Sequence, residues 1–141
     1  MTTNVQFIQP LVALVIWSMV MWLWMYITRI PAITAMKMHL DPKAPSGEQM
    51  SQLPANVRWK ADNYNHLMEQ PTIFYALVLS LAYLGVDSML ARYAAWAYVA
   101  LRIVHSLVQA LSNIIELRFA VFILSNIPLL ILIFCTVRAV F

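Results

Sequence analysis

The stretch DNYNHLMEQP, residues 62–71, runs without a break into the apolar segment TIFYALVLSLAYL, residues 72–84. The apolar part alone, residues 71–84, spans only about 21 Å as a helix, whereas the hydrocarbon core of a bilayer is about 30 Å thick. A helix that crosses the membrane here must therefore begin earlier and include Asn65, His66 and Glu69. Because such polar groups are costly in contact with lipid, we expect them to face other helices or a wet cavity.

The composition of the whole chain is typical of an integral membrane protein. Of its 141 residues, 62% are hydrophobic and 11% are charged, and the mean hydropathy is +0.74. Few soluble domains of this length tolerate such values. The apolar runs are continuous and do not alternate with polar residues, which favours helices over a barrel. The formal charge of +3 is too small to indicate a nucleic-acid partner.

We therefore predict an all-α, integral membrane four-helix bundle that forms a single domain over residues 1–141. The apolar runs and the turn residues between them place the helices at about 7–30, 60–84, 89–112 and 117–140. Pro31 is expected to end the first helix, and Pro128 to kink the last one. The only long polar stretch, residues 31–57, contains three prolines and a glycine after Pro31 and is predicted to be a loop.

Basic residues indicate how the bundle is oriented. Of the nine lysines and arginines, five lie close to or within the connection between the first two helices: Arg29, Lys37, Lys43, Arg58 and Lys60. Loops rich in basic residues remain on the cytoplasmic side. The long first loop is therefore predicted to be cytoplasmic, with both termini on the far side of the membrane.

All four predicted helices bring polar side chains to the same side of the membrane as this loop. Helical spacing places several of them on common stripes of their helices. The candidate site residues are Arg29 on the first helix, Asn65, His66 and Glu69 on the second, Arg102, His105 and Gln109 on the third, and Arg118 on the fourth.

This set of residues suits a small zwitterionic ligand that carries carboxylates. Guanidinium groups grip carboxylates through paired hydrogen bonds, and Glu69 can bind an ammonium group. The surrounding lipid can supply an apolar co-substrate. An alternative is a structural ion pair between Glu69 and Arg102 that holds the bundle together. No metal site is predicted, because His39 has no second histidine or cysteine nearby at ligand spacing. Cys135 lies in an apolar run and is interpreted as a packing residue.

The same residues resemble a known family, the membrane-associated proteins in eicosanoid and glutathione metabolism (MAPEG). The stretch from Asp62 to Tyr75 is similar to the family's Asn-x-x-Glu-x-x-Pro-x-Phe type signature, particularly in bacterial members. The segment RIVH, residues 102–105, with Arg118 further on, is similar to an Arg-x-x-His…Arg arrangement in the prostaglandin E synthase branch. The resemblance covers nearly the whole chain.

The resemblance implies a homotrimer that binds glutathione as a co-substrate on the cytoplasmic side, between neighbouring subunits. By position, Arg118 would stabilise the glutathione thiolate and act as the catalytic residue, and Glu69 would hold the amino end. The carboxylate or backbone groups of glutathione would be held by Arg102, His105 and Arg29. The other implied glutathione-binding residues are Asn65, His66 and Gln109. The implied location is the bacterial inner membrane, in contact with membrane lipid.

The chain departs from the family pattern around this implied site. His66 stands where the family commonly has asparagine, and Asp62 and Asn65 stand where the prostaglandin branch has arginines. Gln109 replaces a tyrosine, and Phe119 replaces a serine. These differences remove positive charge and hydroxyl groups from the implied glutathione site.

Two functions follow from these observations. The first is a glutathione-dependent transferase or peroxidase that acts on an apolar electrophile or a lipid hydroperoxide. The alternative is a non-catalytic lipid-binding or scaffold protein of the same fold. A small transporter is less well supported, because the sequence contains no inverted repeat.

Overall fold

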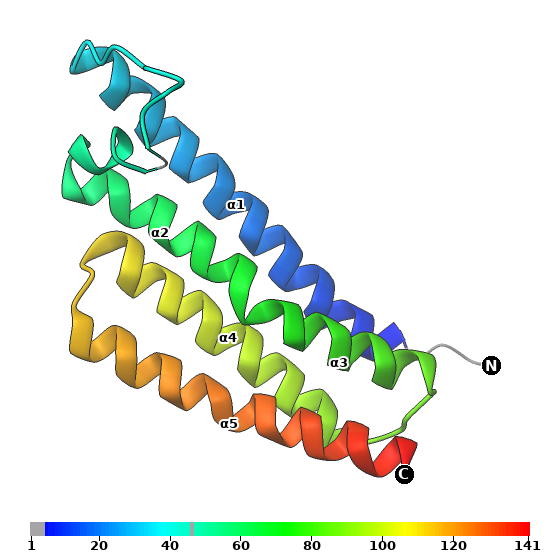
Figure 1. Ribbon diagram of the computed structural model, residues 1–141. Coiled ribbons are helices and arrows are strands. Elements are labelled where there is room, and N and C mark those ends of the chain that lie inside the picture. The colour runs from blue at the N-terminus through cyan, green and yellow to red at the C-terminus, as the bar shows by residue number, and fades with distance from the viewer. Residues whose placement is uncertain (1–4, 46) are drawn as a thin grey trace.

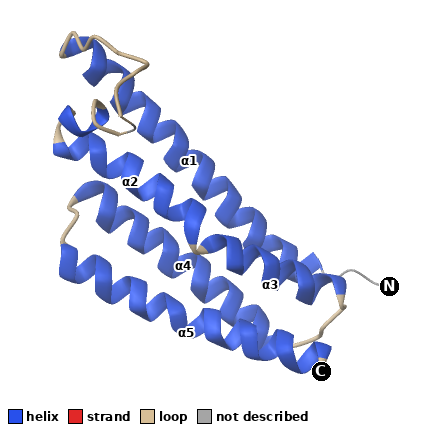
Figure 2. Ribbon diagram, viewed as in Figure 1, coloured by secondary structure: helices blue, strands red, loops and turns tan. Residues whose placement is uncertain are grey.

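The computed structural model describes residues 5–45 and 47–141, which form helices and connecting loops with no strand. The helices are α1 (Val5–Ala35), α2 (Ala55–Glu69), α3 (Pro71–Tyr83), α4 (Met89–Leu111) and α5 (Ile115–Val140), and a short 3-10 helix, η1 (Met50–Gln52), lies in the first loop. α2 and α3 follow one another almost end to end, so the chain forms four antiparallel rods (Figure 1, Figure 2). The predicted all-α bundle is confirmed.

The two ends of the bundle carry different parts of the chain. The loop between α1 and α2 and the link between α4 and α5 lie at one end, which we call the loop end. Both described chain ends and the turn between α3 and α4 lie at the other end (Figure 1). The polar stretch predicted as a loop therefore lies at the same end as the link that precedes Arg118.

The helix boundaries differ from the predicted ones at two prolines. Pro31 lies inside α1, which continues to Ala35 instead of ending at residue 30. A proline inside a helix removes one hydrogen bond without always ending the helix. The predicted single helix at 60–84 begins earlier, at Ala55, and is divided at Gln70, because Pro71 cannot donate a backbone hydrogen bond and begins α3. The backbone of Gln70 remains helical (φ −60°, ψ −38°), so the break is slight.

Three helices, α1, α4 and α5, are long and apolar enough to cross a membrane. In the most apolar stretch of α1 and of α5, only 22% of the residues are buried inside the protein, compared with 50% in α4. α4 is therefore the central helix, and α1 and α5 present broad apolar faces to lipid. α3 alone is too short to span, so the second crossing needs the polar end of α2, as the sequence indicated.

Small side chains on α4 allow its neighbours to approach closely. Ala91, Ala94 and Ala95 are buried, and Tyr98 stacks on Phe74 of α3 with ring centroids 4.7 Å apart. Close packing of this kind is what holds helices together in lipid, where the hydrophobic effect contributes little between them. This packing fixes the position of α4 along the bundle axis, relative to the break between α2 and α3.

A polar network crosses the bundle at that break. Tyr98 Oη donates to Gln70 Oε1 (3.3 Å), and Gln70 Nε2 donates to Asn126 Oδ1 (2.6 Å) on α5. Asn126 Nδ2 in turn donates to the carbonyl of Phe122 (2.9 Å). The side chain of Gln70 therefore joins three helices at the point where its own rod is interrupted.

Replacing Asn126 by Ala should destabilise the fold by about 1 kcal/mol, because the Gln70 amide loses its interhelical partner. Thermal unfolding in detergent measures this effect. Ser80→Ala is the matched control, since the Ser80 hydroxyl bonds only to the Ala76 carbonyl of its own helix. Equal stability of the two variants would contradict a role for the network.

Candidate functional site

The site begins with a contact between the last turn of α2 and the middle of α4. Arg102 is fully buried, and its Nη2 donates to His66 Nδ1 (2.9 Å) and to the His66 carbonyl (3.2 Å). A guanidinium can only donate, so His66 Nδ1 must accept. His66 is therefore neutral, and its proton lies on Nε2.

Aromatic rings surround this contact. The His66 and His105 rings are stacked, with centroids 4.9 Å apart and an angle of 22° between their planes. Phe122 of α5 meets His66 edge-on at 5.4 Å, and the Arg102 guanidinium lies 5.9 Å from the Phe122 ring centroid. Three helices thus fix the orientation of the two imidazoles.

A cavity of about 300 Å³ opens next to the stacked histidines. Its lining residues are His66, His105, Ile115, Arg118, Phe119 and Phe122. Three of the predicted site residues, from α2, α4 and α5, therefore line one cavity, which we call the histidine cavity.

The histidine cavity has a charged wall at Arg118 and an apolar wall at Phe119. Arg118 Nη1 donates to Asn113 Oδ1 (2.6 Å), and Asn113 occupies the link before α5 with a positive φ of 49°. This contact holds one side of the guanidinium. Phe119 and Ile115 are 63% and 65% exposed, so the cavity adjoins an apolar face that lipid can reach.

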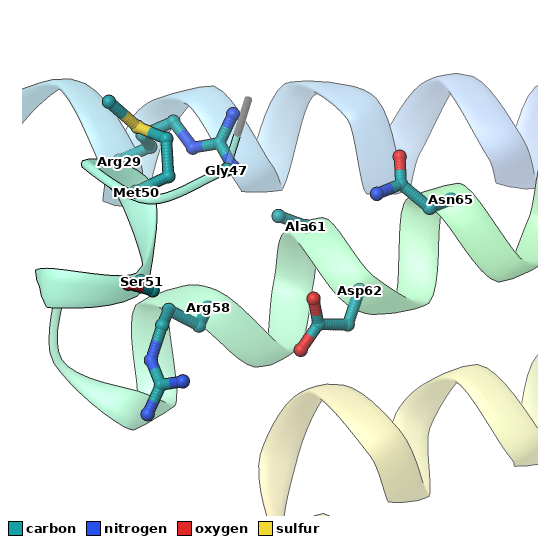
Figure 3. Close-up of a pocket in the computed structure, with 8 residues that line it drawn as sticks. All are labelled: Arg29, Gly47, Met50, Ser51, Arg58, Ala61, Asp62 and Asn65. Carbon is teal, nitrogen blue, oxygen red and sulfur yellow. The ribbon is translucent and has the colours of Figure 1, made fainter. Parts of the chain in front are cut away.

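Two of the predicted residues lie elsewhere. Arg29 and Asn65 line a separate cavity of about 270 Å³ at the loop end, which we call the loop cavity (Figure 3). Its other lining residues are Gly47, Met50, Ser51, Arg58, Ala61 and Asp62. The eight candidate residues therefore do not all converge on one cavity of this chain. Arg58 was not among the sequence candidates, since a basic residue in a basic loop gives no separate signal.

Glu69 and Gln109 line neither cavity. Glu69 is exposed, and the only ion pair within residues 5–45 and 47–141 joins Arg92 to Asp87 (2.8 Å). The alternative of a structural Glu69–Arg102 ion pair is therefore wrong. Gln109 is buried on α4, and its Oε1 has no hydrogen-bond partner.

The lining of the histidine cavity includes the Arg118 guanidinium and no carboxylate. Behind His66, Arg102 Nε and Nη1 are buried without a partner, as is His105 Nδ1. Buried polar groups are normally satisfied, so atoms of this kind indicate bound water or a ligand. Such a surrounding stabilises negative charge on a bound molecule. No cluster of metal-ligating side chains occurs in the described part of the chain.

Together, the fold and the cavity define a multi-pass integral membrane protein with a cationic, aromatic-walled site close to its loop end. A model of the MAPEG family matches residues 7–138, nearly the whole chain. The chain therefore belongs to the MAPEG family. No curated protein and no solved structure matches it in the same comparisons.

Proposed function

We propose that this protein binds glutathione at the histidine cavity and uses it in transferase or peroxidase chemistry on an apolar electrophile or a lipid hydroperoxide. The observation that carries the proposal is the cavity itself, where Arg118 and two fixed imidazoles meet apolar walls with no acidic residue between them. Membership of the MAPEG family is consistent with such a role.

The residues around the cavity fit the groups of glutathione. Its carboxylates suit Arg118 and the His66 Nε2–H, and the field of the buried Arg102 favours an anion nearby. Its ammonium group suits Glu69, which lies outside the cavity lining in the last turn of α2, is exposed and forms no ion pair within the described residues. Arg29 and Asn65 line the loop cavity and are left out of this set.

Glutathione supplies a thiol, which is a nucleophile only as the thiolate. With a pKa of about 8.5, a free thiol is mostly protonated at neutral pH. The Arg118 guanidinium favours the charged form, and its bond to Asn113 holds it at the cavity wall. Phe119 and Ile115 provide an apolar approach for a substrate that arrives from the lipid.

The proposed assembly is a homotrimer, with the long loop on the cytoplasmic side of a bacterial inner membrane. Asp62, Asn65 and Glu69 are all exposed and lie at helical spacing on α2. Polar groups of this kind at or near membrane depth favour a protein partner over lipid. A neighbouring copy packed on this stripe would enclose it.

Replacing Glu69 by Gln should weaken glutathione binding about tenfold, because one charge-assisted contact with the ammonium group is lost. Calorimetry in detergent measures the affinity, and sedimentation measures the oligomer, which should be unchanged. Glu48→Gln removes the same charge from the loop and should change neither. A dissociated oligomer with unchanged affinity would assign Glu69 a structural role instead.

The alternative, a non-catalytic lipid-binding or scaffold protein, has its own support. Gln109 and Phe119 lack the hydroxyl groups that the family resemblance places at the glutathione site, and Arg118 already bonds to Asn113. Turnover of a model electrophile separates the two functions. Lipid binding without turnover of either an electrophile or a hydroperoxide would favour the scaffold.

A further inference from the structure

The walls of the histidine cavity are rich in flat rings. Of its six lining residues, four carry an aromatic or imidazole ring: His66, His105, Phe119 and Phe122. Phe119 and Phe122 lie three residues apart on α5, and therefore on one face of that helix. Rings of this kind attract another ring through offset-stacked and edge-to-face contacts, in addition to the area that they bury. The lining therefore favours a reactant that carries a planar ring over one with a flexible chain.

The two phenylalanines differ in how firmly they are held. Phe122 is half-buried and contacts both imidazoles, with its ring centroid 5.4 Å from that of His66 and 6.1 Å from that of His105. Phe119 is 63% exposed, on the side of the cavity that lipid can reach. A flat molecule that arrives from the lipid can therefore lie on Phe119 and meet the fixed ring of Phe122.

His66 adds one hydrogen-bond donor of fixed tautomer to these walls. Its Nδ1 accepts from Arg102 Nη2 (2.9 Å), so the ring proton is on Nε2. The Nε2–H forms no hydrogen bond within residues 5–45 and 47–141. A neutral imidazole is suited to polarising a carbonyl oxygen, whereas a guanidinium such as that of Arg118 grips a carboxylate better. A carbonyl oxygen of the electrophile is therefore the acceptor that fits His66 best.

We infer that the electrophile is a planar conjugated ketone of the quinone type, which places its ring against Phe119 and Phe122 and one carbonyl oxygen at the His66 Nε2–H. This inference rests on the proposed function, since it names the class of molecule that the bound glutathione attacks. It sets quinones above lipid hydroperoxides, which have neither a planar ring nor a carbonyl at the reacting group.

The reaction is a conjugate addition. The thiolate sulfur bonds to a ring carbon, and the C=C π electrons move to the carbonyl oxygen, which becomes an enolate. The negative charge that Arg118 first stabilises on sulfur thus passes to an oxygen that accepts from His66. This oxygen takes up one proton from water, equal to the one that the thiol released, and transfer of the ring hydrogen to the second oxygen gives a hydroquinone thioether. Glutathione and the quinone are the only reactants, so no further oxidant or reductant is needed.

The test compares three probes with the full-length protein in detergent and glutathione. Menadione is a flat quinone with a free ring position, a straight-chain vinyl ketone has the carbonyl without the ring, and linoleic acid hydroperoxide has neither at its reacting group. For each probe, kcat/KM is divided by the rate constant of the spontaneous reaction with glutathione, which removes differences in intrinsic reactivity. The expected order of this rate enhancement is menadione, then the vinyl ketone, then the hydroperoxide.

Two variants separate the ring from the donor. Phe119→Leu should lower the enhancement for menadione about fivefold, the value of one ring contact, and lower that for the vinyl ketone by less. His66→Leu should lower the enhancement for both ketones about 100-fold, as loss of one oxyanion donor does. Phe134→Leu is the matched control, because Phe134 is similarly exposed (57%) and lines a different cavity near the other end of α5. It should leave all three values unchanged.

Failure of this inference differs from failure of the proposed function. A larger enhancement for the hydroperoxide than for menadione, or equal losses for all three probes in Phe119→Leu, would overturn the quinone class and leave glutathione chemistry standing. No enhancement for any probe would overturn both. Calorimetry with glutathione shows whether the site persists in His66→Leu, and Phe119→Leu decides alone if that variant does not fold.

Discussion

Replacing Arg118 by Ala should lower kcat/KM for glutathione conjugation to a model electrophile by about 100-fold or more. Loss of one group that stabilises a reacting anion typically has an effect of this size. Arg118 is the cation in direct contact with the histidine cavity, where its guanidinium is held by Asn113. Steady-state kinetics at pH 7 measures the effect, and calorimetry on the same variant should show a much smaller loss of glutathione affinity.

Arg138→Ala is the matched control for this experiment. Arg138 lies near the opposite end of α5 and lines a different cavity, next to Cys135. Its replacement should leave both rate and affinity unchanged. Equal losses of rate and affinity in Arg118→Ala would limit Arg118 to binding and contradict its catalytic role.

Replacing Arg102 by Met should abolish glutathione binding without destabilising the protein. Arg102 is fully buried, has two unpartnered guanidinium nitrogens and forms no ion pair. Keeping such a charge out of water is costly, and an apolar side chain of similar volume is often neutral or stabilising by up to about 4 kcal/mol. The same change removes the contact that fixes the tautomer and position of His66.

Thermal unfolding and glutathione calorimetry on Arg102→Met measure the two effects. Arg102→Lys keeps the charge but loses the planar fork, so it should retain part of the binding and remain less stable than Arg102→Met. A large loss of stability in Arg102→Met, with glutathione binding intact, would show that Arg102 is a structural residue of the bundle.

The general architecture could be predicted because it depends on local patterns. Continuous apolar runs indicate membrane helices, and the turn at residues 85–88 and the link before Arg118 separate them. The position of Arg102 and His105 inside the bundle also follows from a simple rule, since ionisable groups avoid lipid. Both side chains are buried.

The details of the site depend on tertiary packing that no local pattern records. Glu69 and His66 both lie in the last turn of α2 on neighbouring faces, and only the packing of α4 determines that Arg102 contacts His66. Asn65 and His66 are adjacent in sequence, but a helix turns about 100° per residue. They therefore line different cavities.

The aromatic wall and the helix break were missed for similar reasons. Phe122 lies in an apolar run, where nothing distinguishes a ring that packs on two histidines from one that faces lipid. Gln70 appears in sequence as one more polar residue before Pro71, whereas its side chain joins α4 and α5. The position of Pro71 in the sequence did not show whether the helix would end there or continue with a slight break. Pro31 is a second example, because it lies inside α1.

The most direct measurement is an ultraviolet pH titration of the glutathione thiolate in the presence of a saturating concentration of the wild-type protein. The expected result is a thiol pKa at least about one unit below the free value of about 8.5, because Arg118 favours the charged form. The shift should disappear in Arg118→Ala. A thiol that titrates at its free value, or no binding at millimolar glutathione, would contradict a glutathione-activating site at the histidine cavity.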